Sequence, residues 1–518
     1  MPLHRLWSAH TNLPAVAKGP RSHSTMPNPN SPTAAGLRAI ATRGMSWMAV
    51  QTVGTRVLSL AGQLFLGWLL SPADFGLYAL ALSISNAVGA LRNGGVTQML
   101  VRHSEDFDRH ARSLGGFALT FNLLTTVVLA LVAPWAASHF HSRQLSGLLL
   151  CIAASFPLGT LAVIYRSRLT VDGRYRDLTA LTFASTLFWQ VATISMALAG
   201  CGPYSYVIPT MLQGPFETAF GFWLIRLWPQ IEVRTNRQRF AAIFRDSRWV
   251  MLGAAMLSLA TTGDYMAVGL FTNAAMVGQY FFAFQLVSAV GTLISSGIES
   301  VLPPLLAKLD LGRPKQNAAV LEMTQIFMLL SWPLAGLVAF AAPPLIHLLW
   351  GSKWAPAAEA LHVLAFCLPA WILKSVVRSL IEARGMWKRR FIFLGAYGIG
   401  GILSPAAGAA TGQIDIIAGA VTGFYLLFAA GLVIILPRLT GNPPLSVVRR
   451  VLVPCCLCLL SSAIAVITAL AFSDRLSAPL APWITAASYI AATLALNGAL
   501  LQREWRASFA MLLSHRST

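Results

Sequence analysis

Long apolar segments separated by short polar ones run through most of this chain. A helix needs about 20 predominantly apolar residues to cross the ~30 Å hydrocarbon core of a bilayer. About fourteen segments satisfy this length: 46–70, 77–100, 114–134, 145–165, 178–199, 205–225, 249–271, 279–306, 320–342, 359–381, 391–411, 415–437, 451–472 and 483–501. The pattern therefore predicts an all-α polytopic membrane protein.

The composition agrees with this interpretation. The 518 residues are 56% hydrophobic and only 11% charged, whereas soluble globular proteins carry about 25% charged residues. An ordinary soluble enzyme, a disordered scaffold and a fibrous protein are excluded. The six cysteines lie in apolar stretches without a histidine or acid at ligand spacing, so we expect neither a metal site nor a disulfide framework, and no cofactor.

The distribution of basic residues predicts the orientation of the chain in the membrane. With the N-terminus in the cytoplasm, 32 of the 38 Lys and Arg residues fall in cytoplasmic segments and three in external ones. The positive-inside rule then places both termini in the cytoplasm. This asymmetry accounts for most of the net charge of +20 without a nucleic-acid partner.

The ends and loops of the chain leave little material outside the membrane. Residues 1–43 form a polar, Pro-rich segment, predicted to be a disordered cytoplasmic tail without a cleavable signal peptide, and Met1, Met26 and Met45 are alternative starts. Several predicted external loops are very short: 71–76, 200–204, 272–278 and 412–414. Any function must therefore lie within the helix bundle.

Two parts of the chain resemble each other. Shifted by 202 residues, 76–100 matches 278–302 at nine of 25 positions without a gap. A shift of 212 places Arg166-Ser167 over Arg378-Ser379. The paired spans run in the same direction, which indicates a parallel repeat of six helices related by an axis along the membrane normal. The matched positions include Gly76 with Gly278, and Pro157 with Pro369.

This repeat predicts two pseudo-symmetric six-helix lobes that face each other across a central cavity with alternating access. The expected divisions are an N-lobe at 44–226, a basic cytoplasmic linker at 227–248, a C-lobe at 249–437, two accessory helices within 438–501 and a cytoplasmic tail at 502–518.

Polar residues inside the predicted spans are the candidates for the cavity wall. Arg56, Ser59 and Gln63 recur at helical spacing on the first span, and polar positions of the second span are matched by polar positions of the eighth. A charge in the middle of a span costs about 2.5–3.5 kcal/mol and normally faces water. The candidate substrate-binding residues are Arg56, Ser59, Gln63, Arg92, Asn93 and Lys374.

Three carboxylates also lie within spans: Glu217, Asp264 and Glu299. They are candidates either for binding a coupling ion, H⁺ or Na⁺, or for ion pairs that hold helices together, for example with Arg92. Arg166 and Arg378 are expected at the cytoplasmic edge, outside the cavity.

The positive charge of Arg56, Arg92 and Lys374 predicts an anionic ligand. A guanidinium donates two parallel hydrogen bonds to phosphate. A phosphorylated lipid head group fits this chemistry.

The stretches Ser71-Pro72-Ala73-Asp74-Phe75-Gly76 and Arg92-Asn93-Gly94-Gly95 resemble bacterial polysaccharide-biosynthesis flippases. These are the O-antigen and exopolysaccharide (Wzx-type) branch of the multidrug/oligosaccharidyl-lipid/polysaccharide (MOP) exporter superfamily. The resemblance covers about 44–440. It implies two lobes in a V, a cationic lumen to which Arg56 and Arg92 belong, and a non-enzymatic transporter of the bacterial inner membrane. It also implies export of an undecaprenyl-diphosphate-linked O-antigen, exopolysaccharide or capsule unit to the periplasmic leaflet. Asn93 stands where the family motif commonly has an acid.

Other functions fit the sequence less well. A multidrug antiporter of the same superfamily would use carboxylates in the first lobe, where the spans offer only Glu217. A glycan polymerase or ligase would need a large external loop, and an ATP-driven pump would need a phosphate-binding G-x-x-x-x-G-K-[ST] loop. A scaffold would not need buried cations. Membrane lipids, a glycan polymerase and a chain-length regulator are the expected partners, while the glycan and the energy source stay open.

Overall fold

The computed structural model describes residues 34–89, 99–100, 106–229, 231–232, 245, 256, 258–259, 261–308, 313–472 and 480–514. The chain divides into two compact units, Met1–Met45 and Ser46–Thr518. The regular structure of the described residues is helical throughout. Every described helix belongs to the second unit, apart from the start of the first helix, which lies in Met1–Met45.

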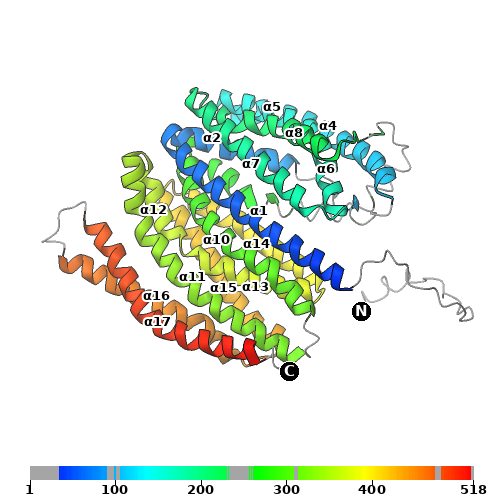
Figure 1. Cartoon of the computed structure of the whole chain (residues 1–518). Coiled ribbons are helices and arrows are strands. Elements are labelled where there is room, and N and C mark those ends of the chain that lie inside the picture. Colours follow the sequence, from blue (N-terminus) through cyan, green and yellow to red (C-terminus); the bar gives the residue numbers. More distant parts are fainter. Residues whose placement is uncertain are drawn as a thin grey trace, which may run out of the picture. The chain divides into compact units, whose positions relative to one another are not determined.

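The helices of the first lobe follow the predicted spans (Figure 1). They are α1 (Ala34–Leu69), α2 (Pro72–Gly89), α4 (Phe107–His139), α5 (Arg143–Leu158), α6 (Thr160–Val171), α7 (Tyr175–Leu198) and α8 (Tyr204–Ile225). Helix α1 begins within the segment predicted to be a tail, where alanine and leucine favour helix. Helices α5 and α6 form one crossing bent by 46°.

The second lobe contains the helical residues 261–269 and seven further elements. These are α10 (Ala274–Lys308), α11 (Arg313–Trp350), the 3₁₀ turn η2 (Gly351–Trp354), α12 (Ala355–Leu364), α13 (Cys367–Ala383), α14 (Trp387–Ala409) and α15 (Ile414–Thr440). The break between α12 and α13 lies at 365–366. Pro369 lies four residues after Ala365. A proline ring clashes with the carbonyl group four residues before it and removes that group from the hydrogen bonds of the helix.

Two accessory helices, α16 (Pro444–Phe472) and α17 (Ala481–Ser514), pack against α11 (Figure 1). The Tyr489 hydroxyl donates a hydrogen bond of 3.1 Å to the carbonyl of Pro333 in α11. The Cys458 thiol of α16 donates to the carbonyl of Trp332 at 3.2 Å. The accessory pair is therefore anchored on the second lobe.

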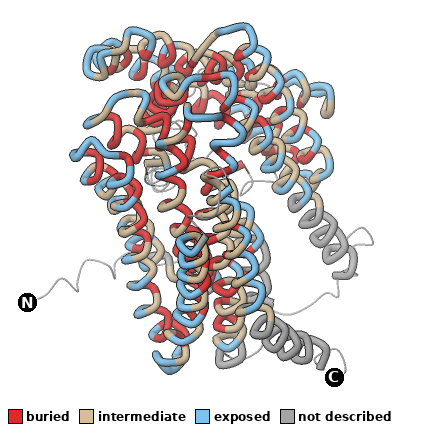
Figure 2. The backbone as a smooth tube through the Cα atoms, turned by 90° about the vertical axis from the view of Figure 1, so that its left-hand side faces the viewer, coloured by how far each residue is buried: buried red, intermediate tan, exposed pale blue. Residues whose placement is uncertain are grey.

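The helices are built to face lipid. Among the described residues, seven helices are long and apolar enough to span a bilayer, or eight if the bent α5–α6 pair counts as one span. Each of the fourteen predicted spans overlaps a helical segment. Large apolar side chains are exposed, such as those of Leu427 at 75% and Leu131 at 72%. Figure 2 shows how buried and exposed residues alternate along the helices. A bilayer, but not water, suits such a surface.

The internal repeat is visible in the backbone. Gly173 and Gly385, which are 212 residues apart, both have left-handed φ values, of 66° and 64°. Gly200 and Gly412 have the same spacing and φ values of 76° and 70°. Glycine adopts this conformation at little steric cost. The repeat therefore extends to the turns that end equivalent helices, and the fold is the two-lobe helical architecture expected from the sequence.

Candidate functional site

The two lobes meet most closely where α2 crosses α10. A Cβ atom on Gly76 would lie 1.7 Å from the carbonyl oxygen of Ala274, and one on Gly278 would lie 1.7 Å from that of Pro72. Both pairs obey the 202-residue shift, so the contact is reciprocal and pseudo-symmetric. Only glycine lets two backbones approach this closely. We call this contact the glycine crossing.

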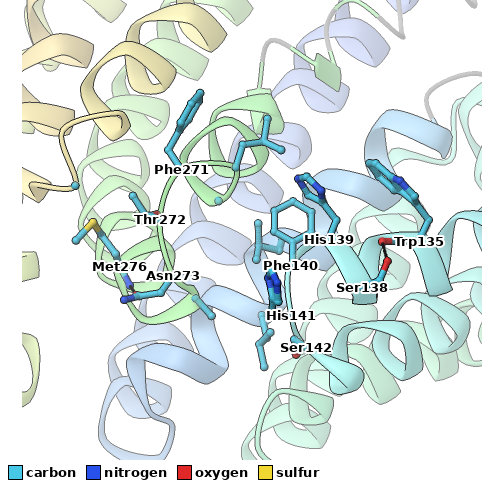
Figure 3. A pocket seen from close by; sticks show the side chains of 16 residues that line it. Trp135, Ser138, His139, Phe140, His141, Ser142, Phe271, Thr272, Asn273 and Met276 are labelled. Atoms are coloured by element: carbon cyan, nitrogen blue, oxygen red, sulfur yellow. Dashed lines mark hydrogen bonds between the residues drawn. The ribbon is translucent and has the colours of Figure 1, made fainter.

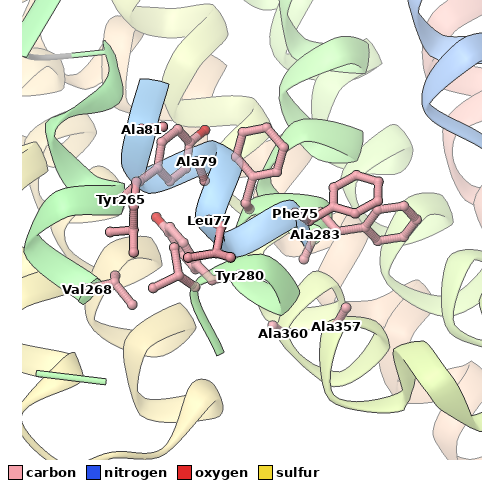
Figure 4. Close-up of a cluster of buried hydrophobic side chains, with 14 of the residues drawn as sticks. Phe75, Leu77, Ala79, Ala81, Tyr265, Val268, Tyr280, Ala283, Ala357 and Ala360 are labelled. Carbon is pink, nitrogen blue, oxygen red and sulfur yellow. The ribbon is translucent and has the colours of Figure 1, made fainter. Parts of the chain in front are cut away.

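Aromatic side chains from both lobes fill the space beside the glycine crossing. Phe75 is fully buried and meets the rings of Tyr206, Phe282 and Trp354 edge-on at 5.5, 5.7 and 5.1 Å. The same apolar cluster continues through Tyr280 and its neighbours (Figure 4). Edge-to-face packing of this kind stabilises aromatic pairs beyond their burial. The cluster seals this end of the boundary between the lobes.

The C-terminal end of α1 is capped by side chains of the other lobe. Trp350 Nε1 donates to the carbonyl of Leu64 at 3.1 Å, and Trp354 Nε1 donates to that of Gly67 at 2.9 Å. Lys353 Nζ donates to the same Gly67 carbonyl at 3.2 Å. The last carbonyls of a helix lack intrahelical partners and attract cations. These bonds tie α1 to the end of α11 and to the η2 turn.

Further along α2, polar contacts also join the lobes. Ser83 Oγ donates to the Thr262 carbonyl at 2.5 Å, and Ser258 Oγ donates to the Asn86 carbonyl at 3.2 Å. By the predicted topology, the glycine crossing and the end of α1 lie at the external side. The hydrogen bonds of Ser83 and Ser258 lie deeper in the membrane.

The predicted polar face of α1 packs partly against α7. Gln190 Nε2 donates to the Ser59 carbonyl at 3.4 Å, and a Cβ on Gly62 would overlap the Gln190 side chain. Gln63 Nε2 is buried without a hydrogen-bond partner in the described part of the chain. Arg56 is exposed, and within the same residues no ion pair engages it.

Two candidate residues, Arg92 and Asn93, lie outside the described residues. Lys374 on α13 lies against Tyr397 of α14. Its Nζ donates to the tyrosine hydroxyl at 3.2 Å and stands 4.3 Å from the ring centre. This contact is a cation–π interaction, and in the described ranges no carboxylate forms an ion pair with Lys374. Arg56 and Lys374 therefore share the lack of a carboxylate partner within the described residues.

Glu217 of α8 forms a buried ion pair with Arg166 of α6. The pair is bidentate, with Arg166 Nε and Nη2 donating to the two carboxylate oxygens at 2.8 and 2.7 Å. Ser185 Oγ adds a bond of 2.5 Å and Gln213 Nε2 one of 3.3 Å. Breaking one side of such a buried pair is strongly destabilising. A cavity of about 280 Å³ beside the pair is lined by polar residues that include Asn122.

Glu299 of α10 pairs with Arg378 of α13 at 2.6 Å, and Arg378 is the repeat equivalent of Arg166. Both arginines are about two-thirds buried, at 33% and 27% side-chain exposure. Sequence reasoning placed them at the cytoplasmic edge and missed their partners. One feature of the sequence could have indicated that these arginines lie inside the bundle. The Arg-Ser pair recurs 212 residues apart, and the serine that follows each arginine, Ser167 or Ser379, is buried.

Asp264 is the third candidate carboxylate and lies close to the boundary between the lobes. It is 8% exposed, and the Tyr280 hydroxyl donates to its Oδ2 at 3.2 Å. Its Oδ1 is buried without a partner in the part of the chain that the structure describes. In the described ranges no group of three or more His, Cys, Asp or Glu side chains is arranged to hold a metal ion.

Comparison with known proteins places this chain in a family. Residues 65–359 match the model of the family described as polysaccharide biosynthesis protein, which is more than half of the chain. The chain belongs to this family. The assignment confirms the family suggested by the Ser71–Gly76 and Arg92–Gly95 stretches.

Two curated relatives of this family member are a succinoglycan biosynthesis transport protein, ExoT, of Rhizobium meliloti, and a teichuronic acid biosynthesis protein, TuaB, of Bacillus subtilis. The first is 24% identical over 326 residues, which are 62% of this chain and 65% of the relative. The second is 23% identical over 352 residues, which are 66% of this chain and 71% of the relative. The family member thus spans about two thirds of the length of these relatives.

Solved membrane transporters share its fold. The lipid II flippase MurJ, in an inward closed conformation, has a TM-score of 0.67 at 13% identity, covering 88% of this chain and 98% of that one. An inward-facing multidrug transporter of the MOP superfamily has a TM-score of 0.58 at 14% identity, covering 76% and 99%. The fold is therefore that of the MOP transporters, and the family member is a multi-pass membrane protein.

Proposed function

We propose that this family member is an alternating-access transporter that moves a lipid-linked oligosaccharide across the bacterial cytoplasmic membrane. The observation that carries the proposal is the glycine crossing. The two lobes touch backbone to backbone at one end of their boundary, on repeat-equivalent residues. A close, symmetric contact of this kind, formed where two helices begin, suits a joint that parts and closes again.

The predicted topology gives this contact a direction. The external side is shut by the glycine crossing, the aromatic cluster and the bonds at the end of α1. The conformation is therefore suited to loading from the cytoplasm, and export to the periplasmic leaflet requires the external contact to open.

The charges of the spans support an anionic substrate. Glu217 and Glu299 are neutralised by arginines, whereas Arg56 and Lys374 have no carboxylate partner in the described part of the chain. A diphosphate moving through a low-dielectric path needs compensation by fixed positive charge. We infer that Arg56 and Lys374, together with Arg92, provide it for an undecaprenyl-diphosphate-linked glycan.

The state of the carboxylates argues against the antiporter alternative. Binding of H⁺ or Na⁺ in the first lobe would need a free carboxylate, and Glu217 is held by Arg166, Ser185 and Gln213. Asp264 of the second lobe lacks a basic partner among the described residues and is our candidate for ion coupling.

The test is deletion of the gene in its native host. We expect loss of one surface polysaccharide together with accumulation of its undecaprenyl-diphosphate oligosaccharide, and restoration of both by the full chain. An intact polysaccharide profile with no accumulated intermediate would contradict the proposal. Sensitivity to cationic drugs without any glycan defect would favour the antiporter instead.

A further inference from the structure

A cavity of about 1090 Å³ lies between the lobes at the face predicted to be external; we call it the outer cavity. One wall is the end of α4 and the turn after it, with Trp135, His139 and His141. The facing wall is the 269–276 segment, which carries Phe271 and other residues of the second lobe (Figure 3). Ligand pockets commonly measure about 300–1,000 Å³. The outer cavity therefore has room for several sugar rings.

Its lining combines exposed aromatic faces with small polar groups. Trp135 and Phe271 are 60% and 56% exposed. Trp135 stacks on His139 with 5.3 Å between ring centres and 10° between planes. Thr272 and Asn273 add a hydroxyl and an amide on the opposite wall. A saccharide has the matching surface, because its ring presents an apolar C–H face for an aromatic side chain and a rim of hydroxyls for polar groups.

The charge of the outer cavity favours an acidic saccharide. The two histidines are the titratable residues of its lining, and neither α2, the 269–276 segment nor Gly412 contributes a charged side chain to it. Arg143 follows the turn and is exposed. His141 has a φ of 51°, in the left-handed region that histidine enters more readily than most residues. An imidazole N–H donates a hydrogen bond to a carboxylate.

The outer cavity is also tied to closure of the lobes. Ala274 lines it, and the carbonyl of the same residue contacts Gly76 in the glycine crossing. Phe140 of the first lobe lies 3.2 Å from the Cβ position of Gly269 in the second. When the lobes separate on this side, the two walls must part. The cavity therefore exists in this form only in the externally closed state.

We propose that the outer cavity binds an acidic saccharide, the glycan end of an exported lipid-linked oligosaccharide, and thereby stabilises the externally closed state. The origin of this saccharide, an exported lipid-linked oligosaccharide, rests on the proposed function. Binding and closure are linked reciprocally, so any change that opens the lobes lowers saccharide affinity by the same factor.

The test is calorimetric titration of the purified full chain in lipid nanodiscs with two soluble probes, tetragalacturonic acid and neutral maltotetraose. We expect the acidic probe to bind about tenfold more tightly than the neutral probe, because only the acidic probe offers carboxylates to the imidazole N–H groups of His139 and His141. Trp135→Ala should weaken binding of both probes about tenfold. The double variant His139→Ala/His141→Ala should remove this preference for the acidic probe.

Matched controls lie elsewhere on the same protein. Trp223→Ala removes another exposed tryptophan and His347→Ala another exposed histidine, and neither lines the outer cavity, so binding should be unchanged. Should Trp135→Ala not accumulate, Asn273→Ala alters the opposite wall. Absence of acidic-probe binding, or binding insensitive to all outer-cavity variants, would overturn the proposal. Soluble-probe binding does not depend on transport, so an intact polysaccharide profile in the deletion strain together with intact probe binding would overturn only the proposed function.

Discussion

Adding one methyl group at the glycine crossing should prevent the lobes from closing on the external side. The variant is Gly76→Ala, with Gly278→Ala as its repeat equivalent. The new Cβ would lie 1.7 Å from a backbone carbonyl oxygen, whereas ordinary contacts begin at 3.4 Å. The obstacle is backbone rather than a flexible side chain, so α2 and α10 must separate by about 1.7 Å, the difference between the two distances.

The energetic effect can be estimated from this displacement. Overpacking of a close contact typically costs about 1–3 kcal/mol, which corresponds to a shift of roughly 5- to 150-fold in a conformational equilibrium. The cost falls on the externally closed state alone. Alanine is a better helix former than glycine by about 1 kcal/mol, so α2 itself should remain folded and the protein should accumulate.

The assay combines glycan export with electron–electron double resonance. Spin labels at Gln144→Cys and Gln413→Cys, both exposed, report the separation of the lobes after the six native cysteines are replaced. Gly76→Ala should lengthen this distance and reduce export severely. Gly423→Ala is the control, since nothing lies within 4 Å of its added Cβ, and both readouts should match the unchanged protein.

A well-accumulated Gly76→Ala variant with unchanged distances and normal export would refute the reasoning. It would mean that the backbone contact between α2 and α10 does not occur in the working cycle. A defect of equal size in Gly423→Ala would also count against it, because the effect would then follow from any glycine replacement in a span.

Three further predictions concern charge and chain length. Glu217→Ala should lower stability by about 3–5 kcal/mol, because Arg166 is left without its partner, and a second change, Arg166→Met, should recover part of the loss in a thermal-unfolding assay. Arg92→Ala should abolish export in a flippase-null strain while the protein still accumulates, whereas Arg92→Lys should rescue partly if charge suffices and poorly if bidentate geometry is needed. A chain starting at Met26 should export normally, and loss of export on removing the preceding residues would contradict this.

The hydrophobic pattern was sufficient to predict the helices because a bilayer imposes length and apolarity on every span. The repeat was visible for a similar reason. Gly76 and Gly278 are equivalent in sequence because two backbones must meet there, and Gly173 and Gly385 because both turns are left-handed. Because constraints of this kind act on single residues, they can be recognised in one sequence.

The pairing of charges could not be predicted in the same way. Arg166 follows a long apolar segment and so resembles a cytoplasmic anchor, but the 46° bend between α5 and α6 separates its helix from the preceding one. Its carboxylate partner, Glu217, is 51 residues away on another helix. Which helices meet is a property of lobe packing, and hydropathy carries no information about it. The glycine crossing was detected as a repeat but not as a contact, for the same reason.

The central claim is tested most directly by reconstitution in proteoliposomes. The undecaprenyl-diphosphate oligosaccharide isolated from the deletion strain would be labelled on its sugar, placed in both leaflets, and exposed to a membrane-impermeant glycosidase outside. We predict that the intact protein lets the enzyme consume the label of both leaflets with time, whereas liposomes containing Gly76→Ala stop near one half. Protection of half of the label in the presence of the intact, correctly folded protein would contradict this claim.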